Sequence, residues 1–111
     1  MNKKEQKALS LLGLAARAGR VAVGVPAICE ALKKGGSRAP LLVLSASNAA
    51  PNSKKRITDR TAYYKVSHIV LEATADTLAH AVGKEGLDVV AVGVTEPHLA
   101  AQIKEELQKE E

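Results

Sequence analysis

The chain contains no phenylalanine, no tryptophan and only two tyrosines among its 111 residues. Hydrophobic residues still make up 46% of the sequence, so the core must be built from small aliphatic side chains. Nucleic-acid-binding modules that stack bases on aromatic platforms need more rings than this sequence offers. The composition therefore argues against that class of module, while the ordinary proportion of charged residues, 25%, indicates a globular protein.

The sequence has one cysteine, Cys29, and cannot form an internal disulfide. No other cysteine or histidine stands at ligand spacing from it, so we expect no metal site and interpret Cys29 as a small buried apolar residue. The apolar stretch 8–18 is interrupted by polar residues and follows a helical period, unlike a signal peptide. No run approaches the roughly 18 apolar residues that span a bilayer. We expect a cytoplasmic protein with no membrane partner.

Motifs for catalysis or cofactor binding are also missing. Gly83-Lys84 lacks the earlier glycine of a phosphate loop, and no Gly-x-Gly-x-x-Gly follows a predicted strand. The three histidines, His68, His80 and His98, lie in different predicted elements without a serine or cysteine in a nucleophile context. A nucleophile and its base also need an orienting third group within reach. We therefore expect no catalytic residues, no cofactor and no enzymatic activity.

Charge is distributed unevenly along the chain, whose net charge is +4. Residues 1–65 carry 13 Lys and Arg against 3 acidic residues, whereas residues 66–111 carry 3 against 9. This asymmetry indicates a polyanionic partner for the first half. A solvated basic surface and an acidic tail, formed by Glu105, Glu106, Glu110 and Glu111, explain it equally well at this point.

The length suits one domain, residues 1–111, and the hydrophobic pattern alternates between two kinds of element. Helical spacing of apolar residues predicts helices over about 2–18, 26–34, 52–64, 74–82 and 97–107. Short apolar runs predict strands at 21–23, 41–44, 68–71 and 89–94. The run 41–44 is typical of a strand buried on both faces. Strands that alternate with helices call for an α/β fold, a single sheet with helices on both faces.

Two local patterns refine the predicted helices. Asn2, with Glu5 three residues later, suits the N-cap of the first helix. In the third helix, Ile57 is placed on the buried face, while Lys55 and Asp59 share the opposite one.

Several segments form an ordered pattern along the chain: Leu11-Leu-Gly-Leu-Ala-Ala-Arg-Ala-Gly19, Gly24, Leu32-Lys-Lys-Gly35, Leu41-Leu-Val-Leu44, Asn52-Ser-Lys-Lys-Arg-Ile-Thr-Asp59, Tyr63-Tyr-Lys-Val66, Gly83-Lys-Glu85 and Val89-Val-Ala-Val92. From about Leu11 to Ala100 this pattern resembles the bacterial YlxQ proteins, ribosomal-protein-like members of the kink-turn RNA-binding superfamily. The resemblance implies a single-domain, three-layer α-β-α sandwich with a small mixed four-stranded sheet. It also implies no catalytic activity and a structured RNA as partner, either kink-turn-like or ribosomal. A monomer is the expected state.

The resemblance places RNA contacts at the start of the second helix, in the loop after the first long strand and in the loop before the last strand. In that superfamily the helix usually starts with Gly-x-Asn-Glu-x-x-Lys. Here Gly24 is kept, whereas Pro26, Ala27 and Glu30 replace the Asn, Glu and Lys. The groups that read sheared G·A pairs and one phosphate are therefore missing. Free backbone N–H groups at the helix start, beside Gly24, still favour a phosphate, although Pro26 contributes no donor.

Basic residues follow the same regions of the chain. Lys33 and Lys34 close the second helix, where cations also complement the helix dipole, so RNA contact and a structural role explain them equally well. Three cations near the start of the third helix are locally unfavourable, which favours an anionic partner there. Arg17 and Arg20 are expected to reach the same surface as Gly24. The candidate RNA-binding residues are Gly24, Val25, Lys33, Lys34, Arg38, Lys54, Lys55, Arg56, Lys84 and Glu85.

Two functions remain open on the sequence. The first is a non-catalytic RNA-binding protein that docks on a folded RNA through backbone phosphates and shape. The alternative is a protein-interaction adaptor that keeps the fold but has lost kink-turn recognition. The replaced helix-start motif and the acidic second half support the alternative.

Overall fold

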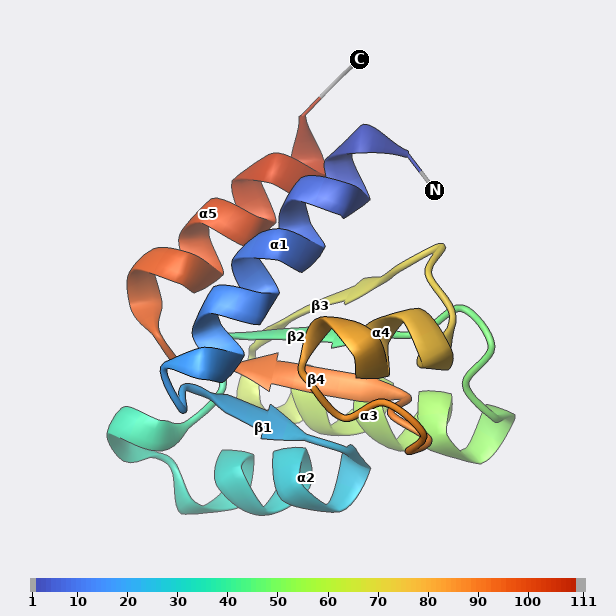
Figure 1. Cartoon of the computed structure of the whole chain (residues 1–111). Helices are drawn as coiled ribbons and strands as arrows, with labels where there is room; N and C mark the ends of the chain where they lie inside the picture. Colours follow the sequence, from blue (N-terminus) through green and yellow to red (C-terminus); the bar gives the residue numbers. More distant parts are fainter. Residues whose placement is uncertain (1, 110–111) are drawn as a thin grey trace.

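The computed structural model describes residues 2–109, which form five α-helices, one short 3₁₀ helix and four strands (Figure 1). In chain order they are α1 (Lys3–Arg17), β1 (Val21–Val23), α2 (Val25–Lys34), the 3₁₀ helix η1 (Gly36–Arg38), β2 (Leu42–Ser45), α3 (Pro51–Tyr64), β3 (Ser67–Val70), α4 (Ala75–Ala81), β4 (Ala91–Val94) and α5 (Pro97–Gln108). Glu110 and Glu111 of the predicted acidic tail lie outside the described residues. None of the helices in residues 2–109 is both long and apolar enough to cross a membrane.

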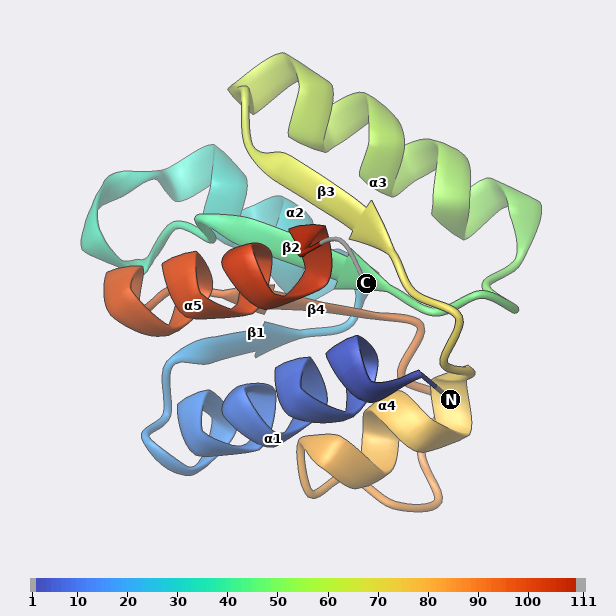
Figure 2. The same cartoon turned by 90° about the horizontal axis from the view of Figure 1, so that it is seen from above.

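The four strands form one mixed sheet in the order β1-β4-β2-β3. β4 is antiparallel to both β1 and β2, whereas β2 and β3 are parallel. Helices α1, α4 and α5 cover one face of this sheet, and α2 and α3 cover the other (Figures 1 and 2). The predicted three-layer sandwich with a mixed four-stranded sheet is confirmed.

Strand β2 separates two hydrophobic cores. Leu42 and Leu44 point into the larger core beneath α1, α4 and α5, while Val43 points into the smaller one beneath α2 and α3. All four residues of the strand are buried, which confirms the predicted burial for 42–44 and adds the polar Ser45. Cys29 lies in the smaller core and is 7% exposed, so its predicted role as a small buried residue is also correct.

The strand boundaries differ from the predictions by one or two residues. β2 begins at Leu42, where its pairing with β3 and β4 starts. Leu41 before it is 48% exposed, although its N–H donates to the carbonyl of Val94 at 2.8 Å. β4 begins at Ala91, and Val89 precedes it as a buried residue of the larger core. The position of the partner strands, and not apolarity, decides where the hydrogen-bonded ladder starts.

The first helix starts as predicted, and its cap leads to a tertiary contact. The side chain of Asn2 accepts a hydrogen bond from the N–H of Glu5 at 2.8 Å. The Glu5 carboxylate is 6% exposed and accepts hydrogen bonds from the N–H groups of Glu72, at 2.7 Å, and Ala73, at 3.0 Å. α1 is thereby tied to the loop that leads into α4.

Candidate nucleic-acid interface

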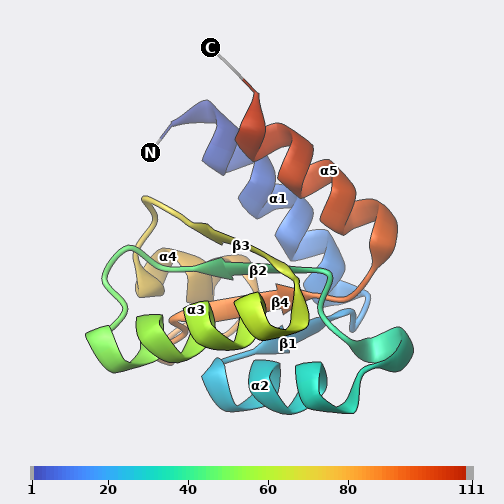
Figure 3. The same cartoon turned by 180° about the vertical axis from the view of Figure 1, so that it is seen from behind.

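The loops to which the resemblance assigns RNA contacts meet at one end of the sheet. β1, β2 and β3 run in the same direction, so α2 and α3 both start at this end, and β4 enters the sheet there (Figure 3). We call it the helix-start end; it comprises residues 24–27, 46–56 and 83–90. Hydrogen bonds hold it together, from the N–H of Ala46 to the carbonyl of Val90 at 2.8 Å and from the N–H of Ala75 to the side chain of Asn48 at 2.9 Å.

At the start of α2, Gly24 adopts φ +93°, a conformation that favours glycine. Its N–H donates to the carbonyl of Ala91 at 2.9 Å, so it is not free for a phosphate, and the expectation of a free N–H is wrong at this residue. The cause is that Gly24 continues the antiparallel ladder between β1 and β4. Because Pro26 has no N–H, the first-turn donors that point out of the helix are those of Val25 and Ala27.

The cations at the start of α3 are not arranged as one cluster. Lys54 is half-buried, whereas Lys55 and Arg56 are exposed. Lys55 forms an ion pair with Asp59 at 3.1 Å, on the exposed face where the pattern placed both. Arg56 lines a groove toward α2 instead. Successive helical residues are rotated by about 100°, and this rotation spreads three consecutive side chains around the helix.

The loop between α4 and β4 brings Lys84 and Glu85 to the helix-start end. The N–H of Lys84 donates to the carbonyl of Ala79 at 2.8 Å, and its side chain is exposed. Glu85 pairs with His80, with 2.9 Å between the carboxylate and Nδ1. Sequence reasoning missed Leu87, which is 59% exposed in this loop. An isolated leucine within the polar stretch 83–88 was the signal that could have identified it.

Other candidate residues lie elsewhere. Lys33, Lys34 and Arg38 stand at the far end of α2 and in the 3₁₀ helix that follows. Arg20 lies at the start of β1, where its guanidinium donates to the carbonyl of Thr95 at 3.4 Å. Arg20 lines a hollow together with Ala27 and Arg38, although the extended β1 places Gly24 roughly 13 Å further along the strand. That Arg17 and Arg20 reach the surface of Gly24 therefore stays a prediction.

A Ser–His contact lies beneath α3. The hydroxyl of Ser45 is 2.8 Å from Nε2 of His68, and both residues face the smaller core from adjacent strands. Burial lowers the pKa of His68 below its usual value and so favours the neutral ring. Within residues 2–109 no carboxylate hydrogen-bonds to this histidine, so the pair lacks an orienting third group.

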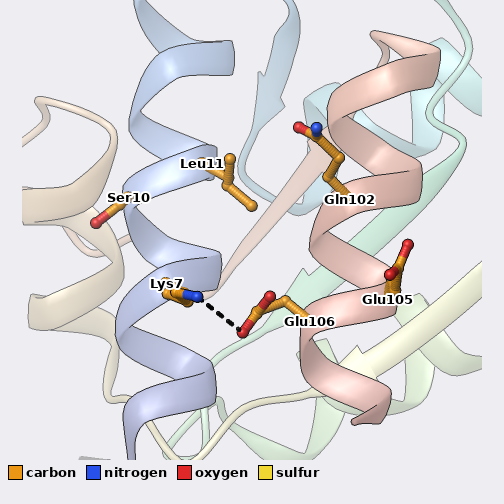
Figure 4. Close-up of a pocket in the computed structure, with 6 residues that line it drawn as sticks. All are labelled: Lys7, Ser10, Leu11, Gln102, Glu105 and Glu106. Atoms are coloured by element: carbon orange, nitrogen blue, oxygen red, sulfur yellow. Dashed lines mark ion pairs between the residues drawn. The ribbon is translucent and has the colours of Figure 1, made fainter.

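A separate hollow of about 420 Å³ lies between α1 and α5, on the opposite face of the sheet from α2 and α3 (Figure 4). It contains Lys7 together with Glu105 and Glu106, and Lys7 pairs with Glu106 at 3.9 Å. None of the ten candidate RNA-binding residues lines it. Across the described part of the chain, no three His, Cys, Asp or Glu side chains are close enough together to hold a metal ion.

Comparisons with known proteins agree with this fold. The sequence pattern of the ribosomal protein L7Ae/L30e/S12e/Gadd45 family matches residues 6–104. A curated relative from Bacillus subtilis (strain 168), called RNA-binding protein YlxQ, is 39% identical over 82 residues, which are 74% of this chain and 78% of the relative. A second protein of that name, from Enterococcus faecium, is 32% identical over 79 residues, which are 71% of this chain and 73% of the relative.

Two solved structures have a similar architecture. A protein of unknown function from Bacillus halodurans superposes with a TM-score of 0.83 at 29% identity, over 93% of this chain and 98% of its own. The Giardia lamblia 15.5kD RNA binding protein superposes with a TM-score of 0.80 at 13% identity, over 97% and 90%, and this likeness concerns the fold alone. The chain belongs to the ribosomal protein L7Ae/L30e/S12e/Gadd45 family, within which it is of the YlxQ type.

Proposed function

We propose that this chain is an RNA-binding domain that docks its helix-start end on a structured RNA, either kink-turn-like or ribosomal. The family contains ribosomal proteins, and both curated relatives are called RNA-binding proteins. The observation that carries the proposal is the meeting of the α2 start, the α3 start and the α4–β4 loop at one end of the sheet. Membership of this family also means that the chain is not an enzyme.

Backbone and charge supply the contacts in this proposal. The N–H groups of Val25 and Ala27 face outward at the positive end of the α2 dipole, where a phosphate is stabilised. Lys54, in the first turn of α3, and Lys84, in the α4–β4 loop, approach the same end and contact neighbouring phosphates. The exposed Leu87 offers an apolar surface against which a base can lie. Gly24 has no side chain to obstruct close approach of the RNA backbone.

The residues that replace the usual helix-start motif determine how this chain recognises RNA on our proposal. Pro26, Ala27 and Glu30 are all exposed on α2, and none of their side chains carries an amide or ammonium donor for a base edge or a phosphate. Recognition on our proposal therefore depends on the shape of the RNA and on its phosphates. The chain acts as a monomer in the cytoplasm on this proposal, with no cofactor or metal.

A titration tests the proposal directly. The full chain is mixed with a kink-turn RNA and with a fully paired hairpin of equal length, each at two salt concentrations. We expect tighter binding to the kink-turn RNA at both concentrations, and weaker binding of both RNAs at high salt because phosphate contacts release counterions. Equal, weak binding of the two RNAs at low salt would contradict the proposal and favour the protein-interaction adaptor.

A further inference from the structure

Helices α2 and α3 lie side by side on their face of the sheet (Figure 3). Side chains of both helices line a groove between them. The groove measures about 670 Å³ and is lined by Pro26, Cys29, Glu30, Lys33, Lys34, Arg56 and Arg60. Four cations thus face one carboxylate. This groove lies along the two helices and continues away from the helix-start end, toward their C-terminal ends.

The cations of the groove are only partly neutralised. The ion pairs in this region join Lys34 to Glu30, at 3.4 Å, and Lys55 to Asp59. Within residues 2–109 no ion pair involves Lys33, Arg56 or Arg60. Both arginines sit one turn apart on α3, so their guanidinium groups follow the same line along the groove. Such a line of uncompensated charge attracts a polyanion.

The two aromatic rings of the sequence stand together at the end of this line. Tyr64 is half-buried and packs against the smaller core, whereas Tyr63 is 78% exposed. The rings meet edge to face, with centroids 4.8 Å apart and planes at 81°. Arg60 borders both the groove and a hollow beside the tyrosines, so the cations and the exposed ring form one continuous surface.

An exposed aromatic ring beside a row of cations is typical of surfaces that bind single-stranded nucleic acid. Tyr63 contributes little to the core, yet its anchored neighbour restricts its position and so reduces the ordering cost of a contact. Surfaces that bind single-stranded nucleic acid combine a positive groove for the backbone with aromatic side chains for the bases. Base–aromatic stacking is sequence-tolerant because every base has a π face.

We propose that the α2–α3 groove and Tyr63 form a second RNA-binding surface, which takes an unpaired strand. Lys33, Arg56 and Arg60 contact its phosphates, and the Tyr63 ring stacks on one base. The proposal rests on the proposed function only in that the ligand is RNA. Since α3 spans about 20 Å, an unpaired strand that leaves an RNA docked at the helix-start end reaches Tyr63 by following the groove.

Three RNAs test this inference with the full chain: a kink-turn hairpin, the same hairpin with a tail of about ten uridines, and the uridine strand alone. We expect the tail to tighten binding at least threefold. Tyr63→Ala and Arg60→Gln should each abolish that gain and leave binding of the tail-less hairpin unchanged. Tyr63→Phe should keep the gain, because the ring remains. Lys7→Gln, a cation-to-amide control on the opposite face, should also keep it.

Tyrosine fluorescence gives an independent readout because the sequence has no tryptophan. In Tyr64→Phe, Tyr63 is the only tyrosine, and stacking of a uridine on it should change its emission as the uridine strand is added. A tail that adds no affinity, or a gain that survives Tyr63→Ala in a folded protein, would overturn the inference and leave the proposed function standing. Tyr63-dependent binding of the uridine strand without binding of the tail-less hairpin would support the inference and overturn the proposed function. Binding of neither RNA would overturn both and leave the groove to a protein partner.

Discussion

At the scale of single residues, Glu5 joins the N-terminal helix to a loop 67 positions further along the chain. Its buried carboxylate is the acceptor for two backbone N–H groups, those of Glu72 and Ala73. A residue of the capping pattern at the start of α1 therefore also holds the loop that leads into α4.

Glu5→Ala should lower the free energy of unfolding by roughly 2–3 kcal/mol, because two N–H groups lose their acceptor in a place that water reaches poorly. The urea midpoint measures this loss. Glu72→Ala is the matched control, since the carboxylate of Glu72 is exposed and, within residues 2–109, accepts only from the side chain of Asn2, at 2.8 Å. A loss as large in the control as in Glu5→Ala would show that the buried carboxylate has no special role.

His68 makes the stability of the fold dependent on pH. Burial lowers the pKa of His68 in the folded chain, so the unfolded chain binds a proton at a higher pH than the folded one does. The contribution of the neutral ring is therefore fully present above about pH 6.5 and is lost as the pH falls toward the lower folded-state pKa. We expect the parent to lose more stability than His68→Gln between pH 7.5 and pH 5.5, as measured by urea midpoints.

Two carboxylates, Glu96 and Glu106, also have shifted pKa values, but they affect stability at a lower pH than His68 does. The N–H of Leu99 and the adjacent His98 lower the pKa of Glu96, and a hydrogen bond from Lys109 lowers that of Glu106. Their stabilising effect is present above their ordinary pKa and is lost only as the pH falls below it, which separates their window from that of His68. A difference between the parent and His68→Gln that stays constant from pH 7.5 to pH 5.5 would refute the histidine's role.

At the scale of elements, β4 is central because it pairs on both sides, with β1 and with β2. Its Gly93 lies opposite Ala22 on one neighbour and Val43 on the other. A Cβ atom at this position would lie 2.9 Å from both Cβ and Cγ of the buried Pro40. The glycine is therefore required by the close approach of the segment that enters β2.

Gly93→Ala should destabilise the fold by about 1–3 kcal/mol through overpacking, although alanine suits a strand better than glycine does. The urea midpoint again gives the value. Combining it with Pro40→Gly, which removes both Cβ and Cγ, should give a smaller loss than the sum of the two single losses. Additive losses would mean that contact with Pro40 is not the cause.

At the scale of the whole molecule, the basic first half of the sequence is divided between two faces. α3 carries Lys54, Lys55 and Arg56 near the helix-start end, while α1 carries Lys3, Lys4 and Lys7 on the opposite side of the sheet. Three cations can therefore be replaced on either helix, so that the effect of net charge on RNA binding can be distinguished from the effect of where the charges lie.

Replacing Lys54, Lys55 and Arg56 by glutamine should weaken RNA binding and flatten its salt dependence. Each lost phosphate contact changes the slope of log K against log salt by about 0.9 for a duplex, so two or three contacts change it by about two. Replacing Lys3, Lys4 and Lys7 by glutamine removes the same charge and should leave the slope nearly unchanged. Equal slopes in the two variants would show that net charge, and not the helix-start end, governs binding. Stability should change by less than about 0.5 kcal/mol in either.

The arrangement of candidate residues was only partly predictable. Lys55 and Asp59 are paired on an exposed face, as helical spacing indicated. Arg56 could not be assigned to a groove with Lys33, because the spacing of residues within one helix does not say which other helix lies beside it. No pattern in the sequence indicated a role for Tyr63. Its position depends on the neighbouring Tyr64, which packs against the smaller core and contacts the Tyr63 ring edge to face.

The sequence by itself determined the succession of helices and strands, the burial of 42–44 on both faces and the cap at Asn2, because periodicity and capping depend on neighbours within a few residues. Only the tertiary structure decided the strand order β1-β4-β2-β3 and the meeting of α2, α3 and the α4–β4 loop at one end. It also decided that Gly24 donates its N–H to Ala91 and that Arg20 lies at the far end of β1. These features depend on contacts between residues up to 75 positions apart in the sequence. Ladder hydrogen bonds and close packing act across space, and no local sequence pattern identifies the partner.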